Sequence, residues 1–319
     1  MQIKQIRIKN IVIPNNIFMA PLAGYTCYPF RILCQELGAG LSFTEMVSAN
    51  GLKHNDNIAK NIIFTDEREK IKAVQLLGGE PDIMEIAACS EKLKDFDIID
   101  INMGCPVPNV FKSGEGSALL GDIKRAYNII NKCKKSGKII SVKFRIGINE
   151  KELITAEFAK MCEYAGADII SIHGRSRNMM YSGTPYYEQI HQAKSVVNIP
   201  VIANGGIFSK EDADFMIEQT GADGVMIGRY GLANPFIFSE LLGNEHIKKS
   251  KLDILKEQIN LLVELCYKNI YSETFALSYI KKICSYIMKK EKGTKQYKQK
   301  IFQCGSMNDI KHIIEIALS

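Results

Sequence analysis

The sequence has no segment that suggests a membrane span, a secretory route or a disordered tail. No apolar run approaches the roughly 20 residues that a helix needs to cross a bilayer. The N-terminal stretch MQIKQIRIKN alternates apolar and polar residues, so it predicts a strand or hairpin and not a signal peptide. Low-complexity stretches of any length are also missing. These absences predict a folded protein that works in the cytoplasm.

The cysteine patterns of metal sites and disulfide frameworks are absent as well. Nine cysteines are present, but no two are spaced as CxxC, and an odd number fits reduced thiols. We therefore expect no metal and no disulfide. Eight of the cysteines are expected to be packing residues, and Cys105 is the exception for reasons given below.

The segment 244–319 contains no arginine, yet it carries all the excess positive charge of the chain. It has 14 lysines against eight acidic residues, a balance of +6, which equals the net charge of the whole protein. The first 243 residues are therefore neutral overall. This asymmetry indicates contact with a polyanion. A solvated helical surface in a lysine-rich proteome explains the charge equally well, so charge alone does not decide.

Eight short apolar runs recur over the first 230 residues, and each is the length of a buried strand. Helix-like stretches lie between them, for example at 81–94, 123–135, 154–165 and 210–220, and the period is about thirty residues, as in a βα unit. This pattern predicts a (β/α)8 TIM barrel. A doubly wound open sheet is the alternative, but no G-x-G-x-x-G follows the first strand. The runs begin at Ile17, Leu41, Ala73, Ile98, Ile139, Ile169, Val201 and Gly224.

The pattern changes after Gly243, where apolar residues take helical spacing. Helices are expected at 252–270, 275–290, 296–302 and 307–318. The sequence thus predicts two domains, a catalytic barrel at 1–243 and a small all-helical domain at 244–319.

Polar residues follow nearly every predicted strand, at the end where a TIM barrel carries its active site. Several polar groups converging on one mouth are hard to explain as strand caps, because buried polar groups cost free energy unless they are paired. We therefore expect a ligand site there. The polar strand ends include Gln75, Asn102, Lys143, Arg145, His173, Arg175, Asn204 and Arg229.

The ligand's chemistry follows in part from the residue types. Gly205-Gly206 and Gly228-Arg229 follow strands seven and eight, where this fold commonly binds phosphate. Gln75, Asn102 and Lys143 offer amide and ammonium donors that suit the pyrimidine edge of a flavin ring. A Schiff-base role for Lys143 is the competing use. It needs an apolar pocket that lowers the pKa of the amine, and a polar mouth is not expected to do so.

Cys105 lies between Gly104 and Pro106, in a loop that continues to the segment SGEGS at 113–117. A thiol on such a loop beside the mouth can act as a proton donor. The plainer alternative is an inert small hydrophobic residue.

Six segments occur in order along the chain: Met19-Ala-Pro-Leu-Ala-Gly24, Thr44-Glu-Met-Val-Ser-Ala-Asn50, Asp100-Ile-Asn-Met-Gly-Cys-Pro106, Ser113-Gly-Glu-Gly-Ser-Ala-Leu-Leu120, His173-Gly-Arg-Ser-Arg177 and Met226-Ile-Gly-Arg229. Together they resemble bacterial tRNA-dihydrouridine synthases, and the subtype looks like the B-type branch. The resemblance implies bound FMN, NADPH as reductant, and reduction of the C5–C6 double bond of uridine in tRNA.

The resemblance also implies individual roles. Cys105 is expected to be the catalytic acid that protonates C5. RNA contacts are expected from Arg175, Arg177, Tyr279, Lys281 and Lys282. The residues expected at the cofactor are Pro21, Leu22, Ala23, Gln75, Asn102, Lys143, His173, Asn204, Gly205, Gly206, Gly228 and Arg229.

Two departures from the family pattern affect these expectations. Gly206 stands where the family commonly has an acidic residue, so only backbone contacts to a phosphate remain there. The tail has Ser278-Tyr-Ile-Lys-Lys282 in place of the family's usual His-Leu-Arg-Lys and Trp signature, which puts the RNA-binding mode in doubt.

Three alternatives stay open at this point. They are a flavin enzyme for a small substrate, such as a dihydroorotate dehydrogenase or an ene-reductase, an RNA-binding module without activity, and a Schiff-base lyase. For the expected enzyme we predict tRNA as the partner, no DNA or membrane contact, and action as a monomer.

Overall fold

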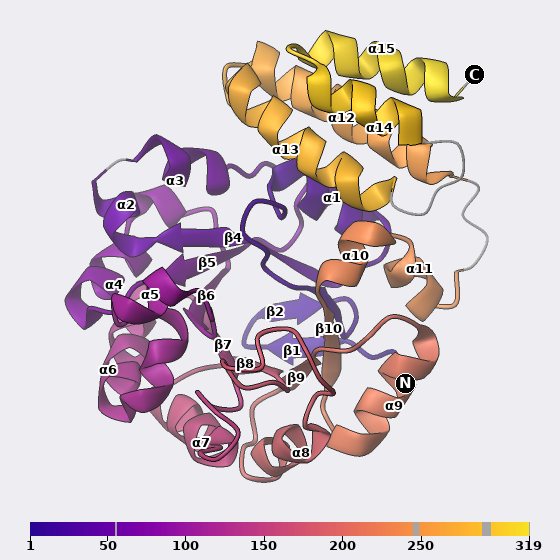
Figure 1. The fold of residues 1–319 in the computed structure, drawn as a ribbon. Helices are drawn as coiled ribbons and strands as arrows, with labels where there is room; N and C mark the ends of the chain where they lie inside the picture. The colour runs from indigo at the N-terminus through magenta and orange to yellow at the C-terminus, as the bar shows by residue number, and fades with distance from the viewer. Residues whose placement is uncertain (55, 245–248, 289–294, 319) are drawn as a thin grey trace.

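Eight parallel strands close into a barrel, as the sequence predicted. The computed structural model describes residues 1–54, 56–244, 249–288 and 295–318. Neighbouring strands follow chain order, and the last pairs with the first, Val225 lying opposite Ile17. Figure 1 shows the ring with its helices outside. The strands are β3 (Ile17–Met19), β4 (Leu41–Ser48), β5 (Ala73–Leu77), β6 (Ile98–Met103), β7 (Ile139–Arg145), β8 (Ile169–His173), β9 (Val201–Asn204) and β10 (Gly224–Ile227).

The helices around the barrel begin and end close to the expected positions. Gly166 and Gly221 end two of them in the left-handed conformation that favours glycine. Three short 3-10 helices lie at Glu91–Leu93, Gly116–Gly121 and Lys134–Ser136. The α-helices are α1 (Tyr28–Glu36), α2 (Ala49–Lys53), α3 (Asn57–Ile62), α4 (Pro81–Ala88), α5 (Pro108–Lys112), α6 (Ile123–Cys133), α7 (Thr155–Ala165), α8 (Tyr187–Ser195), α9 (Lys210–Thr220), α10 (Arg229–Ala233) and α11 (Ile237–Leu241).

Side chains alternate along each barrel strand between the interior and the surrounding helices. In β6, Ile98 belongs to an apolar cluster inside the barrel, whereas Ile99 and Ile101 pack in the cluster that includes the outer helices. The same alternation turns Asp100 and Asn102 inward, toward hydrogen-bond partners on neighbouring strands. The barrel interior therefore has an apolar lower layer and a polar upper layer at the C-terminal ends of the strands.

An N-terminal hairpin covers the apolar end of the barrel. Its strands are β1 (Ile6–Ile8) and β2 (Ile11–Ile13), which pair antiparallel. Ile6, Ile8 and Ile13 belong to the same buried cluster as the first residues of several barrel strands. Figure 1 shows the hairpin across the centre of the ring. Because this end is closed, a ligand can enter the barrel only from the polar end.

Four helices of the C-terminal segment pack together on one side of the barrel (Figure 1). They are α12 (Lys251–Tyr267), α13 (Glu273–Ile287), α14 (Lys295–Gln303) and α15 (Met307–Leu318). The expected end of the second helix at residue 290 lies outside the described residues. In this bundle α12 contacts α1 and α13 contacts α10. The Gln258 side chain donates a hydrogen bond to the Pro29 carbonyl at 2.9 Å.

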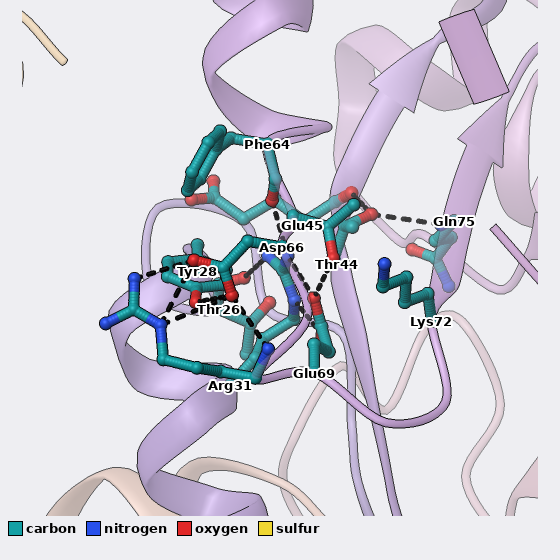
Figure 2. Close-up of polar contacts among 12 residues, drawn as sticks. Thr26, Tyr28, Arg31, Thr44, Glu45, Phe64, Asp66, Glu69, Lys72 and Gln75 are labelled. Atoms are coloured by element: carbon teal, nitrogen blue, oxygen red, sulfur yellow. Dashed lines mark hydrogen bonds and ion pairs between the residues drawn. The ribbon is translucent and has the colours of Figure 1, made fainter. Parts of the chain in front are cut away.

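A buried ion pair supports the barrel surface beneath the bundle. Arg31 on α1 and Glu69 both have side chains that are 0% exposed, and two N–H···O contacts of 2.7 and 3.0 Å join them. The guanidinium also donates to the carbonyls of Thr26 and Phe64. Figure 2 shows these contacts between α1 and the β4–β5 connection. Phe64 stacks edge-on against Tyr271, which follows α12, so the pair fixes a surface on which the bundle packs.

We expect removal of one partner of this pair to destabilise the protein strongly. Arg31→Met should lower the free energy of unfolding by about 3–5 kcal/mol, because it leaves the Glu69 charge buried without a cationic partner. The double variant Arg31→Met/Glu69→Leu should be more stable than Arg31→Met. Urea unfolding followed by circular dichroism measures both. Glu264→Gln, which breaks an exposed pair with Lys268, is the control and should change stability by less than about 1 kcal/mol. A double variant less stable than Arg31→Met would contradict the expectation.

Candidate active site

A cavity of about 660 Å³ opens at the polar end of the barrel, within the size range of small-molecule sites. Every barrel strand contributes to its wall, either with one of its own residues or with the residue that follows the strand. All twelve residues expected at a cofactor line it, and so does Cys105. The structure thus brings the predicted site residues together, while their individual roles remain predictions.

The cavity is strongly cationic. Lys143, Arg145, Arg175 and Arg229 all line it. Burial lowers the pKa of Lys143, and Arg145 lowers it further, against the attraction of Asp100. The expectation that a polar mouth would leave this pKa unlowered was therefore wrong, because burial outweighs the polar neighbours. This concentration of positive charge suits a bound anion.

The glycine segments after β9 and β10 form a cradle for such an anion. Gly205 and Gly206 have φ values of +115° and +74°, in the region that favours glycine. A Cβ on Gly205 would lie 2.9 Å from the His173 ring, and one on Gly206 would lie 3.1 Å from Pro185. Among the residues that the structure describes, the N–H groups of both glycines have no hydrogen-bond partner. They remain available to an oxyanion.

Two amides and one amine face the deeper part of the cavity. Asn102 Nδ2 donates to Gln75 Oε1 at 2.8 Å. Lys143 Nζ donates to Asn204 Oδ1 at 3.0 Å, and Asn204 in turn donates to the Met226 carbonyl. An ammonium has three N–H donors, and this is the one hydrogen bond that Lys143 makes within the described part of the chain. Its remaining donors fit an acceptor-rich ligand such as the pyrimidine edge of a flavin.

Cys105 lies in the loop after β6 and is held there on two sides. Its N–H donates to Asn102 Oδ1 at 2.9 Å, and its carbonyl accepts from Ser117 Oγ at 2.7 Å. The side chain is 8% exposed and lines the cavity. Burial raises the pKa of the thiol, although the Val107 N–H and Arg145 oppose the rise. The thiol therefore keeps its proton near neutral pH, as a proton donor requires.

His173 is an uncharged ring in a cationic setting. Burial, followed by the charges of Arg145 and Lys143, holds its pKa well below the usual range. Its Nε2 lies 3.2 Å from Arg175 Nη1. Because a guanidinium can only donate, this nitrogen is the acceptor in the pair.

Arg145 was noted at a strand end but was given no role, and the structure shows what it joins. Its Nε donates to the Gly104 carbonyl at 2.9 Å, beside Cys105. Its Nη1 donates to the carbonyls of Ser176 and Met180 in the loop after β8. The inward alternation of residues 139, 141, 143 and 145 in β7 was the signal that could have identified it.

Tyr181, in the loop after β8, was not identified from the sequence. Its ring centre lies 5.4 Å from the guanidinium carbon of Arg145 and 4.1 Å from that of Arg229. The residue is 44% exposed and lines the cavity. An aromatic ring at this position can stack on a base that enters the site.

The residues expected to contact RNA are not all on the surface. Tyr279 is only 2% exposed and its hydroxyl lies near Cys27, where the bundle packs on the barrel, which corrects its expected role, because a buried ring cannot stack on RNA. Arg175 is 8% exposed and binds the carbonyls of Ser182 and Gly183, so it belongs to the cavity wall. Lys281 is partly buried and donates to the Cys304 carbonyl.

Two of the expected RNA contacts remain well placed for a polyanion. Lys282 is exposed, and its ammonium would lie 3.2 Å from a Cβ on Gly24, at the edge of the cavity. Arg177 is partly exposed and stacks over the Phe111 ring at 3.9 Å.

A family model and the curated relatives of this chain agree on one protein family. A family model described as dihydrouridine synthase (Dus) matches residues 18–319. A tRNA-dihydrouridine synthase B of Pasteurella multocida is 37% identical over 262 residues, which are 81% of this chain and 78% of that protein. Its counterpart in Pseudomonas putida is 34% identical over 92% of this chain and 88% of its own. A probable tRNA-dihydrouridine synthase 1 of Synechocystis is 32% identical over 99% and 90%.

Solved structures show the same fold at low sequence identity. A morphinone reductase has a TM-score of 0.57 at 13% identity, over 77% of this chain and 90% of its own. A 2-naphthoyl-CoA reductase has a TM-score of 0.59 at 12% identity, over 75% and 52%. At this identity the likeness concerns the barrel alone.

We expect His173 to stay neutral from pH 8 down to about pH 6. Its ring resonances in an NMR titration should not shift in that range. The unfolded chain takes up a proton at residue 173 below about pH 6.5, whereas the folded protein does not. The contribution of His173 to stability is therefore fully present above that pH and falls as the pH is lowered further. A His173 resonance that titrates between pH 6 and 7 would contradict this expectation.

Proposed function

The chain belongs to the dihydrouridine synthase family, and from that premise we propose that it reduces uridine in tRNA to 5,6-dihydrouridine with FMN and NADPH. The observation that carries the proposal is the cationic cavity that unites the flavin-type donors, the glycine cradle and a protonated Cys105. Family membership also argues against the Schiff-base lyase, although the pKa of Lys143 is lowered.

The residues present fit FMN. Gln75, Asn102 and Lys143 would hold the pyrimidine edge of the ring, and Pro21 to Ala23 would line the ring on the β3 side. The phosphate would lie at Asn204 to Gly206 and at Gly228 and Arg229. A side chain at position 206 would lie close to Pro185, so Gly206 would contact the phosphate through its backbone. When bound, FMN would supply the hydride chemistry by which reducing equivalents from NADPH reach C6 of the uracil ring.

The protein's own contribution to the reaction is to place a proton beside the ring. The Cys105 thiol keeps its proton because of burial, and it supplies that proton to C5. Arg145 holds the backbone beside Cys105 and so fixes the direction from which the proton comes. The cavity is closed below by the hairpin, so the target uridine has to leave the RNA stack to enter it.

We propose that residues 1–243 form the catalytic barrel and that residues 244–319 form the tRNA-binding domain. The excess of lysine in the second segment and the exposed position of Lys282 support this division. Within the described part of the chain, no helix is both long and apolar enough to cross a bilayer. We further propose that the protein acts as a monomer in the cytoplasm, on tRNA and not on DNA.

Visible spectroscopy of the purified protein tests the function as a whole. We expect a flavin absorption band that bleaches with anaerobic NADPH and returns when unmodified tRNA is added. Fully dihydrouridine-modified tRNA is the matched control and should leave the band bleached. A band that ignores unmodified tRNA would indicate an enzyme for a small substrate. If no flavin binds even after FMN is added, the proposed cofactor site is wrong.

Cys105→Ala should separate flavin reduction from uridine reduction. We expect the variant to retain its flavin and to bleach with NADPH as the parent does. Reoxidation by tRNA should slow by about 100-fold or more, because the proton donor is gone. Cys133→Ala, which changes a buried thiol on α6 outside the cavity, should reoxidise at the parent rate. Reoxidation of Cys105→Ala at the parent rate would remove the residue from the reaction.

A further inference from the structure

Within the described part of the chain, Asp100 is the one acidic residue of the polar upper layer whose side chain binds an amide that lines the cavity. It is 1% exposed and does not itself line the cavity. The strand register places it between Gln75 on β5 and Ser141 on β7. Its Oδ2 accepts from Gln75 Nε2 at 2.6 Å, and its Oδ1 accepts from Ser141 Oγ at 2.6 Å. Each oxygen of the carboxylate is therefore engaged.

The contacts continue from Gln75 to the loop that carries Cys105. Gln75 Oε1 accepts from Asn102 Nδ2 at 2.8 Å. Asn102 Oδ1 then accepts from the N–H of Gly104 at 3.1 Å and from the N–H of Cys105 at 2.9 Å. An unbroken series of hydrogen bonds thus joins Asp100, inside the barrel, to the backbone of the proposed proton donor.

All these bonds run in one direction, and the groups at both ends set it: the backbone N–H groups of Gly104 and Cys105 can only donate, and the carboxylate of Asp100 is the final acceptor. An ionised carboxylate can only accept, so Gln75 must turn its NH2 toward Asp100 and its oxygen toward Asn102. Asn102 must then turn its NH2 toward Gln75 and its oxygen toward the loop. Reversing either amide would place two donors or two acceptors face to face, which costs free energy in a buried site.

We propose that Asp100 is a positioning residue: as the charged acceptor at the end of the series, it holds the Gln75 and Asn102 amides in place and, through them, the backbone of Cys105. The proposal depends on the proposed function only for the role of Cys105 as the proton donor. Orientation matters to the cofactor as well, because these two amides are the groups that would face the pyrimidine edge of FMN.

A neutral residue at position 100 would not hold the Gln75 and Asn102 amides as firmly. An asparagine there could turn either its oxygen or its NH2 toward Gln75, and Ser141 Oγ could pair with whichever end remained. Because the backbone N–H groups of Gly104 and Cys105 still require the oxygen of Asn102, only the first of these keeps the series intact, and it lacks the charge-assisted bond to Gln75. Burial raises the pKa of Asp100, against the lowering effects of Ser141, Gln75 and Lys143. A carboxylate in this setting is an expensive way to satisfy two donors unless its strict acceptor character is needed.

An exchange of acid and amide tests the proposal. The readout is the rate at which Cys105 is alkylated by iodoacetamide in the purified full-length protein, resolved by peptide mass spectrometry. Asp100→Asn and Gln75→Glu should each change this rate by about tenfold, the equivalent of one hydrogen bond to a charged group. Asp100→Asn replaces the charge-assisted bond to Gln75 by a weaker one, and Gln75→Glu places two carboxyl groups in contact.

The double variant Asp100→Asn/Gln75→Glu should return the rate to within about threefold of the parent. In it, the new carboxylate at position 75 can accept both from the new amide at position 100 and from Asn102, so the Asn102 amide and the loop regain their orientation. Additive losses in the double variant would overturn the proposal, because a packing role predicts additivity and a shared network predicts coupling. A parent-like rate in Asp100→Asn alone would overturn it too.

Two further measurements keep the test decisive. Ser171→Ala removes a buried hydroxyl of β8 that has no partner among the described residues, and it should leave the Cys105 rate unchanged. If Asp100→Asn does not fold, the comparison of Gln75→Glu with the double variant decides alone. Alkylation requires no tRNA, so a protein without dihydrouridine synthase activity could still show the coupling, and failure of the function would be distinguishable from failure of this proposal.

Discussion

The register of one closed parallel sheet is the constraint on which the site depends. Because side chains alternate along each strand, three side chains of β6 point into the barrel. From its lower to its upper end they are the apolar Ile98 and the polar Asp100 and Asn102. A slip of one residue in β6 would turn Asp100 and Asn102 against the helices and bring Ile99 and Ile101 into the cavity. The hydrogen bonds among β5, β6 and β7 therefore determine the composition of the site as well as the shape of the barrel.

Much of this arrangement could be predicted from the sequence, because it depends on local patterns. Short apolar runs at βα spacing identify the strands, and the fold then brings their polar ends together. Partners across strands were harder to predict, since they depend on register. The sequence marks Gln75 and Asn102 as donors, but the pairing of Gln75 with Asp100 and of Asn102 with the loop N–H groups shows which way the amides point.

The helical segment illustrates a different limit. Tyr279 was grouped with Lys281 and Lys282 because the three are close in sequence, although a helix separates neighbours by about 100°. Its spacing from Ala276 and Ile283 places it on the buried stripe of α13, so periodicity did contain the correct answer. The Arg31–Glu69 pair gave no such signal. It joins two segments 38 residues apart, and that proximity exists only once α1 packs against the barrel.

The electrostatics of the cavity and the placement of Cys105 both concern the delivery of a proton from the thiol. Four cations attract an anionic ligand, burial together with these charges keeps His173 neutral, and burial keeps the thiol protonated. A protonated thiol is useful only if its direction is fixed, because proton transfer requires hydrogen-bond distance to the accepting atom. The loop is held by Arg145 at the Gly104 carbonyl and by Asn102 at the N–H groups of Gly104 and Cys105. With donor and acceptor sides of the same peptide segment engaged, rotation of the loop would break bonds to both β6 and β7, and the thiol keeps its place in the absence of substrate.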